Sequence, residues 1–148
     1  MSMIKLYDRT TPPTENEKQK IANFLFKHLD EFGDPQPDIE KAIHYATGKE
    51  NTPGGLLIAH WNEDDILGAV VLNKTGMKGY IPENILVYIA THSDHRGKGI
   101  GKKLMNAAIT QTDGDIALHV EPDNPARQLY EQLGFTNKYL EMRLKKEN

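Results

Sequence analysis

Cysteine is absent from all 148 residues of the sequence. Its absence excludes disulfide bonds, thiolate-bound metals and a cysteine nucleophile. Long apolar runs are missing as well. None approaches the roughly 20 residues that a helix needs to cross a bilayer, and the opening stretch "MSMIKLYDRT" lacks the apolar core of a signal peptide. We therefore expect a cytoplasmic protein with no membrane partner.

Positive charge is also in short supply. The chain has 18 Lys and Arg against 21 Asp and Glu, a formal net charge of -3, which argues against a basic face that follows a nucleic acid. Aromatic residues make up only 7% of the chain and are not interleaved with the cations. We expect no nucleic-acid partner, and the length predicts one domain over residues 1–148.

Hydrophobic periodicity predicts both helices and strands. Apolar residues recur at helical spacing after a capping box formed by Thr14 and Glu17, and again between "GDPQP" and Gly48. The runs "GGLLIAHW" and "ILGAVVLN", separated by "NEDD", predict a hairpin, and "KTGMKGYIPE" predicts a loop. The remaining predicted elements are strands at 3–8, 84–92 and 115–121, helices after Gly99 and Asn124, and one or two strands in "FTNKYLEMRLKK". This order predicts an α/β fold with a mixed, mostly antiparallel sheet of six to seven strands and about four helices.

The stretch "NILVYIATH" has apolar residues on both of its alternating faces. Strict alternation assigns Ile85, Val87 and Ile89 to one face and Leu86, Tyr88 and Ala90 to the other. Such a strand is expected in the centre of the sheet with both faces covered.

A glycine-rich, cationic turn, "HRGKGIGKK", follows this central strand and precedes a helix. Backbone N–H groups at a helix N-terminus lack partners within the helix and attract anions, phosphates above all. A Rossmann fingerprint does not fit, because Lys102 stands where its third glycine is needed. A P-loop does not fit either, because Arg96 and Lys103 replace its first glycine and its Ser or Thr. From the glycines alone, a solvated strand-to-helix turn is an equally good interpretation.

The pattern Arg-x-x-Gly-x-Gly does fit, with Arg96, Gly99 and Gly101. In this turn the sequence resembles the GNAT superfamily of acetyl-CoA-dependent N-acyltransferases. A second segment, "VEPDNPARQLYEQLGF", is similar to the strand and helix that carry the family's common Asn and its LY...GF pattern. The resemblance implies a single GNAT-like domain with splayed central strands at 84–92 and 115–121.

The resemblance also implies a coenzyme site. Backbone amides of the turn would hold the pyrophosphate, while the central strand would pair with the pantetheine arm and offer the N–H of Ile89 or Ala90 to the developing oxyanion. The implied coenzyme-binding residues are Ile89, Ala90, Thr91, Arg96, Gly97, Lys98, Gly99, Ile100, Gly101, Lys102, Asn124 and Tyr130.

Tyr130 matches the family tyrosine that protonates the departing thiolate, so we expect it to be the general acid. Its place on an apolar helical stripe also suits a packing aromatic, and Asn124 also suits an N-cap. The identity of the general base does not follow from these motifs. Some family members carry a glutamate at the position that Ile85 matches in this chain, so Glu83 and His119 become the candidates. The ordinary structural alternatives are a loop carboxylate and a solvated histidine. Tyr88, His92 and Glu121 are further residues that could face the gap, directly or through water.

The spacing of His92 and His95 suggests a metal site only weakly, and we expect none. The acceptor would be a primary amine held by residues 15–47 and the loop "KTGMKGYIPE". The alternative function is a non-catalytic module that senses acyl-CoA. A homodimer paired through the terminal strand is a further expectation.

Overall fold

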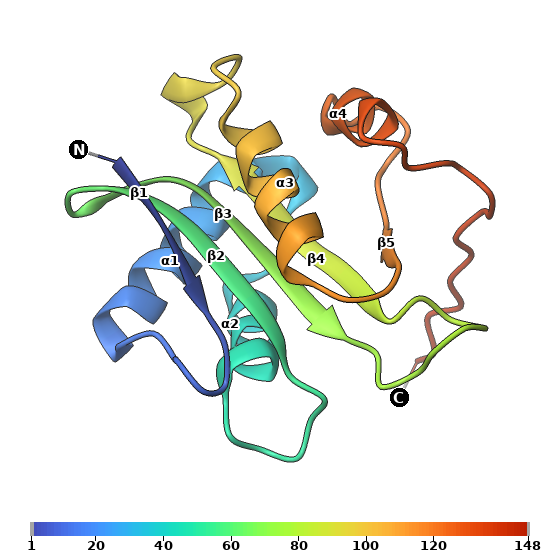
Figure 1. Cartoon of the computed structure of the whole chain (residues 1–148). Helices are drawn as coiled ribbons and strands as arrows, with labels where there is room; N and C mark the ends of the chain where they lie inside the picture. The colour runs from blue at the N-terminus through green and yellow to red at the C-terminus, as the bar shows by residue number, and fades with distance from the viewer. Residues whose placement is uncertain (1, 148) are drawn as a thin grey trace. The chain divides into compact units, whose positions relative to one another are not determined.

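Five strands form one mixed sheet within residues 2–147, the part of the chain that the structure, a computed structural model, describes. The strands are β1 (Ser2–Tyr7), β2 (Gly55–Asn62), β3 (Asp65–Lys74), β4 (Asn84–Thr91) and β5 (Ile116–Leu118). They lie in the order β1-β2-β3-β4-β5 (Figure 1). All neighbours are antiparallel except β4 and β5. The mixed, mostly antiparallel sheet is confirmed, but the expected six to seven strands are wrong.

The missing strands come from the C-terminal part of the chain. The strand expected at 115–121 stops at Leu118, and the described residues after Phe135 form no strand. Leu140, Met142 and Leu144 alternate with charged residues as a strand would, yet each is more than 80% exposed. Alternation marks a segment that is able to pair, whereas a strand exists only where a neighbouring strand accepts its hydrogen bonds.

The helices are α1 (Glu15–Leu29), α2 (Gln36–Thr47), α3 (Ile100–Gln111) and α4 (Ala126–Gln132), which confirms the expectation of about four. Two short 3-10 turns, η1 (Asp30–Phe32) and η2 (Ser93–His95), follow α1 and β4. The capping box of α1 is present, since Thr14 Oγ1 accepts from Glu17 N and Glu17 Oε1 accepts from Thr14 N. None of the helices between residues 2 and 147 has the length and apolar character that crossing a membrane requires.

The chain forms two compact units, the first ending at Leu118 and the second beginning at His119. In the first unit, α1 and α2 cover one face of the sheet and α3 covers the other (Figure 1). The hydrophobic core lies between the sheet and the helices α1 and α2, and in it Ile21, Leu25, Ile39 and Ile43 are fully buried. The second unit contains α4 and the C-terminal segment.

Gly68 on β3 sets how closely α3 approaches the sheet. A Cβ at this position would lie 2.6 Å from Leu104 Cδ1 and 2.9 Å from Ile100 Cγ2. Glycine is therefore required for the first turns of α3 to lie directly on β3. This contact fixes the start of α3, where the glycine-rich turn ends.

Candidate functional site

A β-bulge divides β4 into two parts. Val71 of β3 pairs with Tyr88, but the next residue, Leu72, pairs with Leu86, so Val87 is an extra residue in β4. On its other side β4 pairs with β5 only through Asn84, Ile85 and Leu86. Beyond the bulge, within residues 2–118, no strand lies beside β4 on that side. Bulges bend strands and are common beside active sites, and this one occurs where the pairing of β4 with β5 ends.

The bulge also corrects the predicted faces of β4. Residues opposite each other in a sheet share a face. Tyr88 and Ala90 pack in the core under α1 and α2, whereas Leu86, paired with Leu72, faces the other side. Leu86 and Tyr88 therefore do not share a face, although strict alternation had placed them together. The residues on the odd positions of β4 are only partly buried, so full cover of both faces was also wrong.

The backbone of β4 beyond the bulge presents hydrogen-bonding groups away from β3. His92 N donates to Leu67 O over 2.8 Å. In an antiparallel pair, residues that exchange hydrogen bonds alternate with residues that do not. In the register set by His92, Ala90 therefore exchanges hydrogen bonds with β3, and the backbone N–H and C=O groups of Ile89 and Thr91 point to the opposite edge of β4. Of the two N–H groups considered for an oxyanion, that of Ile89 points to the open edge of the strand.

In the structure, the glycine-rich turn covers residues 93–99. It starts with η2 and ends at Gly99, which is the N-cap residue of α3. Gly97 and Gly99 have φ angles of 80° and 81°, which other residues rarely adopt. In the described part of the chain, no heavy atom lies within 4 Å of where a Cβ would stand on either glycine. Glycine is thus needed here for conformation, not for space. Gly99 has no side chain to cap α3, so the turn offers an exposed helix N-terminus to an anion.

Two contacts tie this turn to the C-terminal end of α1. His28 Nδ1 accepts from Ser93 N over 3.2 Å, and Arg96 Nη2 donates to His28 O over 3.0 Å. Arg96, expected to contact the coenzyme, therefore uses one guanidinium nitrogen to hold the turn in place. Sequence reasoning missed His28, because a single histidine on an apolar helical stripe carries no signal of a contact 65 residues away.

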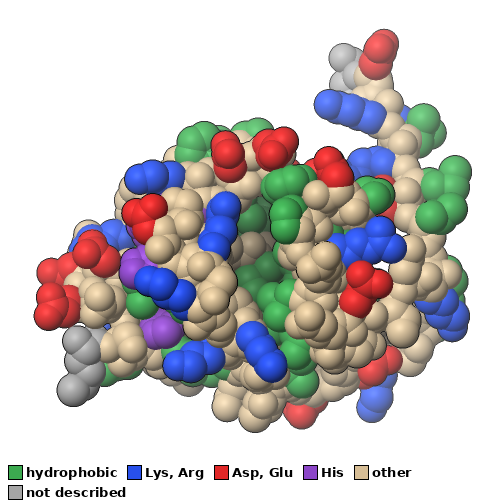
Figure 2. Space-filling model, turned by 90° about the horizontal axis from the view of Figure 1, so that it is seen from above, with side chains coloured by type: hydrophobic (Ala, Val, Ile, Leu, Met, Phe, Trp, Pro, Cys, Tyr) green, Lys and Arg blue, Asp and Glu red, His purple; other side chains and the backbone are tan. Residues whose placement is uncertain are grey.

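Positive and titratable side chains gather around the turn. Figure 2 shows histidines beside Lys and Arg side chains on the face seen from above. The rings of His28 and His92 lie 4.3 Å apart, and those of His92 and His95 lie 5.3 Å apart at a steep angle. Among the described residues, no three His, Asp or Glu side chains are placed to hold a metal ion.

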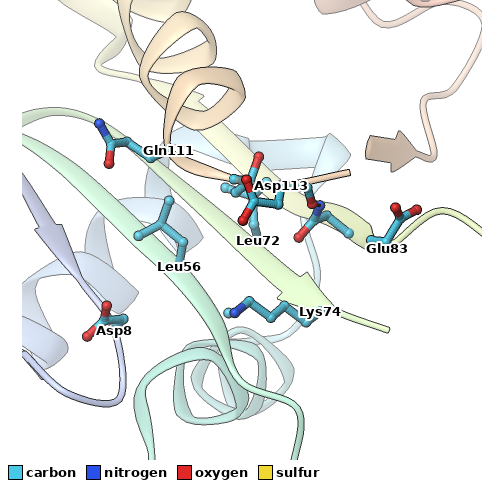
Figure 3. Close-up of a pocket in the computed structure, with 10 residues that line it drawn as sticks. Asp8, Leu56, Leu72, Lys74, Glu83, Gln111 and Asp113 are labelled. Carbon is cyan, nitrogen blue, oxygen red and sulfur yellow. Dashed lines mark hydrogen bonds between the residues drawn. The ribbon is translucent and has the colours of Figure 1, made fainter. Parts of the chain in front are cut away.

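Glu83 lies at the opposite end of β4 from the turn. Its carboxylate packs over Gly114, where a Cβ would come within 2.3 Å of Oε2. It lines a polar cavity of about 320 Å³ together with Lys74, Asn84 and Asp113 (Figure 3). Five residues separate Glu83 from Ile89, and the six residue-to-residue steps of an extended chain span roughly 20 Å. A base at Glu83 would thus act on a carbonyl near Ile89 only through intervening groups.

In the second unit, the "LYEQLGF" segment ends α4 in a way that fixes Tyr130. Phe135 N donates to Tyr130 O, and Gly134 N donates to Glu131 O, with Gly134 at a φ of 100°. These two bonds form a Schellman motif. The rings of Tyr130 and Phe135 then lie 5.9 Å apart. Tyr130 is buried, and this burial raises its pKa to about 12.

Asn124 starts α4 as expected. Its Oδ1 accepts from Ala126 N over 2.9 Å, which is the local capping role predicted for it, although the helix itself begins at Ala126 and not at Pro125. His119, the other candidate base, is exposed and follows β5 directly.

Comparison with known proteins gives a family match. The sequence model of the acetyltransferase (GNAT) family matches residues 5–135, which include the turn, β4 and Tyr130. A search of curated protein sequences gives no match.

Several solved structures share the fold. A ribosomal-protein-alanine N-acetyltransferase from Brucella melitensis superposes with a TM-score of 0.65 at 18% identity, covering 98% of this chain and 99% of that one. Aminoglycoside N-acetyltransferase AAC(6')-Iy, solved with CoA, gives 0.70 at 13% identity, covering 100% and 97%. A transcriptional regulator from Bacillus halodurans gives 0.69 at 20% identity, covering 97% and 99%. At these identities the likeness establishes the fold alone.

Proposed function

Since this chain belongs to the acetyltransferase (GNAT) family, we propose that it moves an acetyl group from acetyl-CoA to a primary amine by direct attack in a ternary complex. The observation that carries the proposal is the exposed turn at the N-terminus of α3, next to the edge of β4 that β5 leaves open. The ligand that fits this arrangement has two parts: a pyrophosphate, which the helix N-terminus can bind, and an arm with amide groups, which can pair with the unpaired edge of β4.

We assign the pyrophosphate to the backbone N–H groups of residues 97–102. The helix dipole of α3 and the cations Lys98 and Lys102 favour negative charge there. The outward-facing backbone groups of Ile89 and Thr91 are suited to pair with the pantetheine amides as a strand would. Arg96 contributes by holding the turn against α1.

The reaction requires stabilisation of negative charge on the carbonyl oxygen. As the amine nitrogen attacks the acetyl carbon, its electron pair forms the new C–N bond and charge builds on that oxygen. The N–H of Ile89 is the donor assigned to it. The C–S bond then breaks, and the phenol of Tyr130, the group assigned as general acid, donates a hydrogen bond to the departing thiolate.

The attacking amine must first lose a proton. His119 follows β5 directly, whereas Glu83 stands at the far end of β4, so we place His119 before Glu83 as the group that accepts it. The test is the pH dependence of kcat/KM in His119→Gln and Glu83→Gln proteins. If neither variant alters the acidic limb, both assignments are wrong.

We assign the acceptor to the first two helices, at the connection between α1 and α2, and to the loop "KTGMKGYIPE". At this connection the Tyr88 hydroxyl donates to the Asp34 carboxylate between the two helices, and Asp30, Glu31 and Asp38 lie nearby in the chain. Carboxylates on this connection are compatible with a cationic amine.

The deciding experiment is calorimetric titration with acetyl-CoA. Gly99→Ala forces a side chain onto a φ of 81°, and Gly79→Ala does the same at 83° in the β3–β4 loop, with open space around both positions. Each substitution carries a similar strain of about 1–2 kcal/mol. We expect Gly99→Ala to weaken binding at least tenfold and Gly79→Ala to leave it unchanged.

No binding by folded wild-type protein, or equal losses in both variants, would overturn the coenzyme site. Binding followed by release of free coenzyme A with an amine from a broad panel supports the enzyme. Binding with no amine-dependent thiol release across that panel supports an acyl-CoA sensor instead.

A further inference from the structure

The imidazole of His28 on α1 is bonded to the backbone of the glycine-rich turn. Its Nδ1 accepts from Ser93 N, while the carbonyl of the same residue accepts from Arg96. His28 is 7% exposed and its ring stacks between Phe24 and His92, with centroid distances of 4.6 and 4.3 Å. One residue of α1 therefore holds both ends of the segment Ser93–Arg96, three residues before Gly99.

This bond depends on the protonation state of the ring. A neutral imidazole has one nitrogen that accepts a hydrogen bond, whereas in an imidazolium both nitrogens are donors. Protonation of His28 would place an N–H against the N–H of Ser93, and the bond would become a repulsive contact.

The surroundings of His28 contain more positive than negative charge. Lys27 comes from α1 itself, and His92 and Arg96 come from the turn packed against it, while the carboxylate of Asp94 opposes them. Burial, and then these cations, lower the pKa of His28 from its ordinary 6.5. These surroundings favour the neutral ring, the form that accepts the hydrogen bond from Ser93 N.

We propose that His28 is a positioning residue for the coenzyme site: its neutral ring fastens the turn to α1, and its protonation releases the turn and weakens acetyl-CoA binding. The inference rests on the proposed function for its second half, because the turn is the site assigned to the pyrophosphate. The first half, release of the turn, concerns the free protein only.

The first half is tested by NMR on the free protein. We expect the Ser93 amide signal to shift, and its hydrogen exchange to accelerate, with the same midpoint as the His28 ring. In His28→Asn, whose Oδ1 can accept from Ser93 N at any pH, this step should disappear. If the Ser93 amide of the wild type does not follow the His28 ring, the proposal is overturned whatever the coenzyme does.

The second half is tested by the Kd for acetyl-CoA at pH 7.5 and 5.5. Other groups of the protein and the coenzyme contribute to the pH dependence of binding, so His28→Asn supplies the baseline. On acidification, we expect the affinity of the wild type to fall about fivefold more than that of His28→Asn. A fivefold change in Kd corresponds to the net contribution of one hydrogen bond. His28→Phe keeps the stacked ring without the acceptor and should bind more weakly at both pH values. His44→Asn, a histidine on α2 that contacts Glu50, is the matched control and should follow the wild type.

The results of these experiments distinguish a failure of the His28 inference from a failure of the proposed function. If the wild type gains affinity relative to His28→Asn at acid pH, the imidazolium acts as a charge for the phosphates and the proposal is wrong. If Ser93 follows His28 but folded wild type binds no acetyl-CoA at pH 7.5, the release of the turn stands, while the proposed function and the coenzyme half fall together.

Discussion

At the scale of single residues, Tyr130 carries the most specific chemical claim. Burial raises its pKa to about 12, whereas a thiol resembling cysteine has a pKa of about 8.5. The phenol is therefore protonated at every physiological pH, but full transfer of its proton to a thiolate is uphill. Its contribution is then mainly a hydrogen bond that strengthens as charge develops on sulfur.

We predict that Tyr130→Phe lowers kcat by about 100-fold, the lower end of the range for general acids, because its pKa is poorly matched to the leaving group. The Kd for acetyl-CoA should change less than twofold, since the phenyl ring still packs against Phe135. Steady-state kinetics and calorimetry measure the two quantities. Tyr139→Phe, on a residue that is 78% exposed, is the control. An unchanged kcat in Tyr130→Phe would leave Tyr130 as a packing aromatic only.

At the scale of elements, the position of α3 depends on the absence of one side chain. Gly68→Ala would bring a Cβ against Leu104 and Ile100, which overpacks the joint between β3 and α3. We predict a loss of about 1–3 kcal/mol in the free energy of unfolding, together with weaker acetyl-CoA binding as the start of α3 moves.

A double-mutant cycle with Leu104→Ala distinguishes steric pressure from a general effect of the substitution. Leu104 is fully buried, so Leu104→Ala alone opens a cavity that costs about 2–5 kcal/mol. The same truncation relieves the contact created by Gly68→Ala. In urea unfolding, the double variant should lose less than the sum of the single losses, and strict additivity would contradict the packing argument.

The elements also mark how far sequence reasoning reaches. The existence of β4, the turn and the helix after it follows from periodicity and glycine spacing, because these are local properties of the chain. The expected central position of β4 was wrong, since β3 lies in the centre of the sheet. The bulge at Val87 does not follow, since it is a property of the register between two strands. Gly68 did give a signal, an isolated glycine inside an apolar strand. The C-terminal strands were predicted from alternation alone, which shows no partner.

At the scale of the whole molecule, family and fold were readable from two motifs and the element order, while the activity was not. Structures with this fold are named as a ribosomal-protein acetyltransferase, an aminoglycoside acetyltransferase and a transcriptional regulator. Function lies in sites built on a fold, so the fold does not identify the proposed amine. The segments that we assign to it, the α1–α2 connection and the β3–β4 loop, carry no recognisable sequence pattern.

Whole-molecule stability should depend on pH through two buried histidines. Burial lowers the pKa of both His28 and His60, so each binds a proton more readily in the unfolded chain than in the fold. Their contribution to stability is complete above pH 6.5, the ordinary pKa, and is lost as the pH falls from there through the lowered folded-state value.

His60 offers a way to reverse part of this loss. It is 5% exposed on β2, and its Nδ1 has no hydrogen-bond partner among residues 2–147. His60→Leu removes both an unsatisfied buried nitrogen and a group that binds a proton more readily in the unfolded chain. We predict that the free energy of unfolding rises by about 1 kcal/mol at pH 7.5 and by more at pH 5.5, as measured by urea unfolding. His119→Asn, on an exposed histidine of the second unit, is the control. If His60→Leu is less stable than the wild type at pH 7.5, the prediction is wrong. The interactions of the buried imidazole then stabilise the fold by more than its removal from water costs.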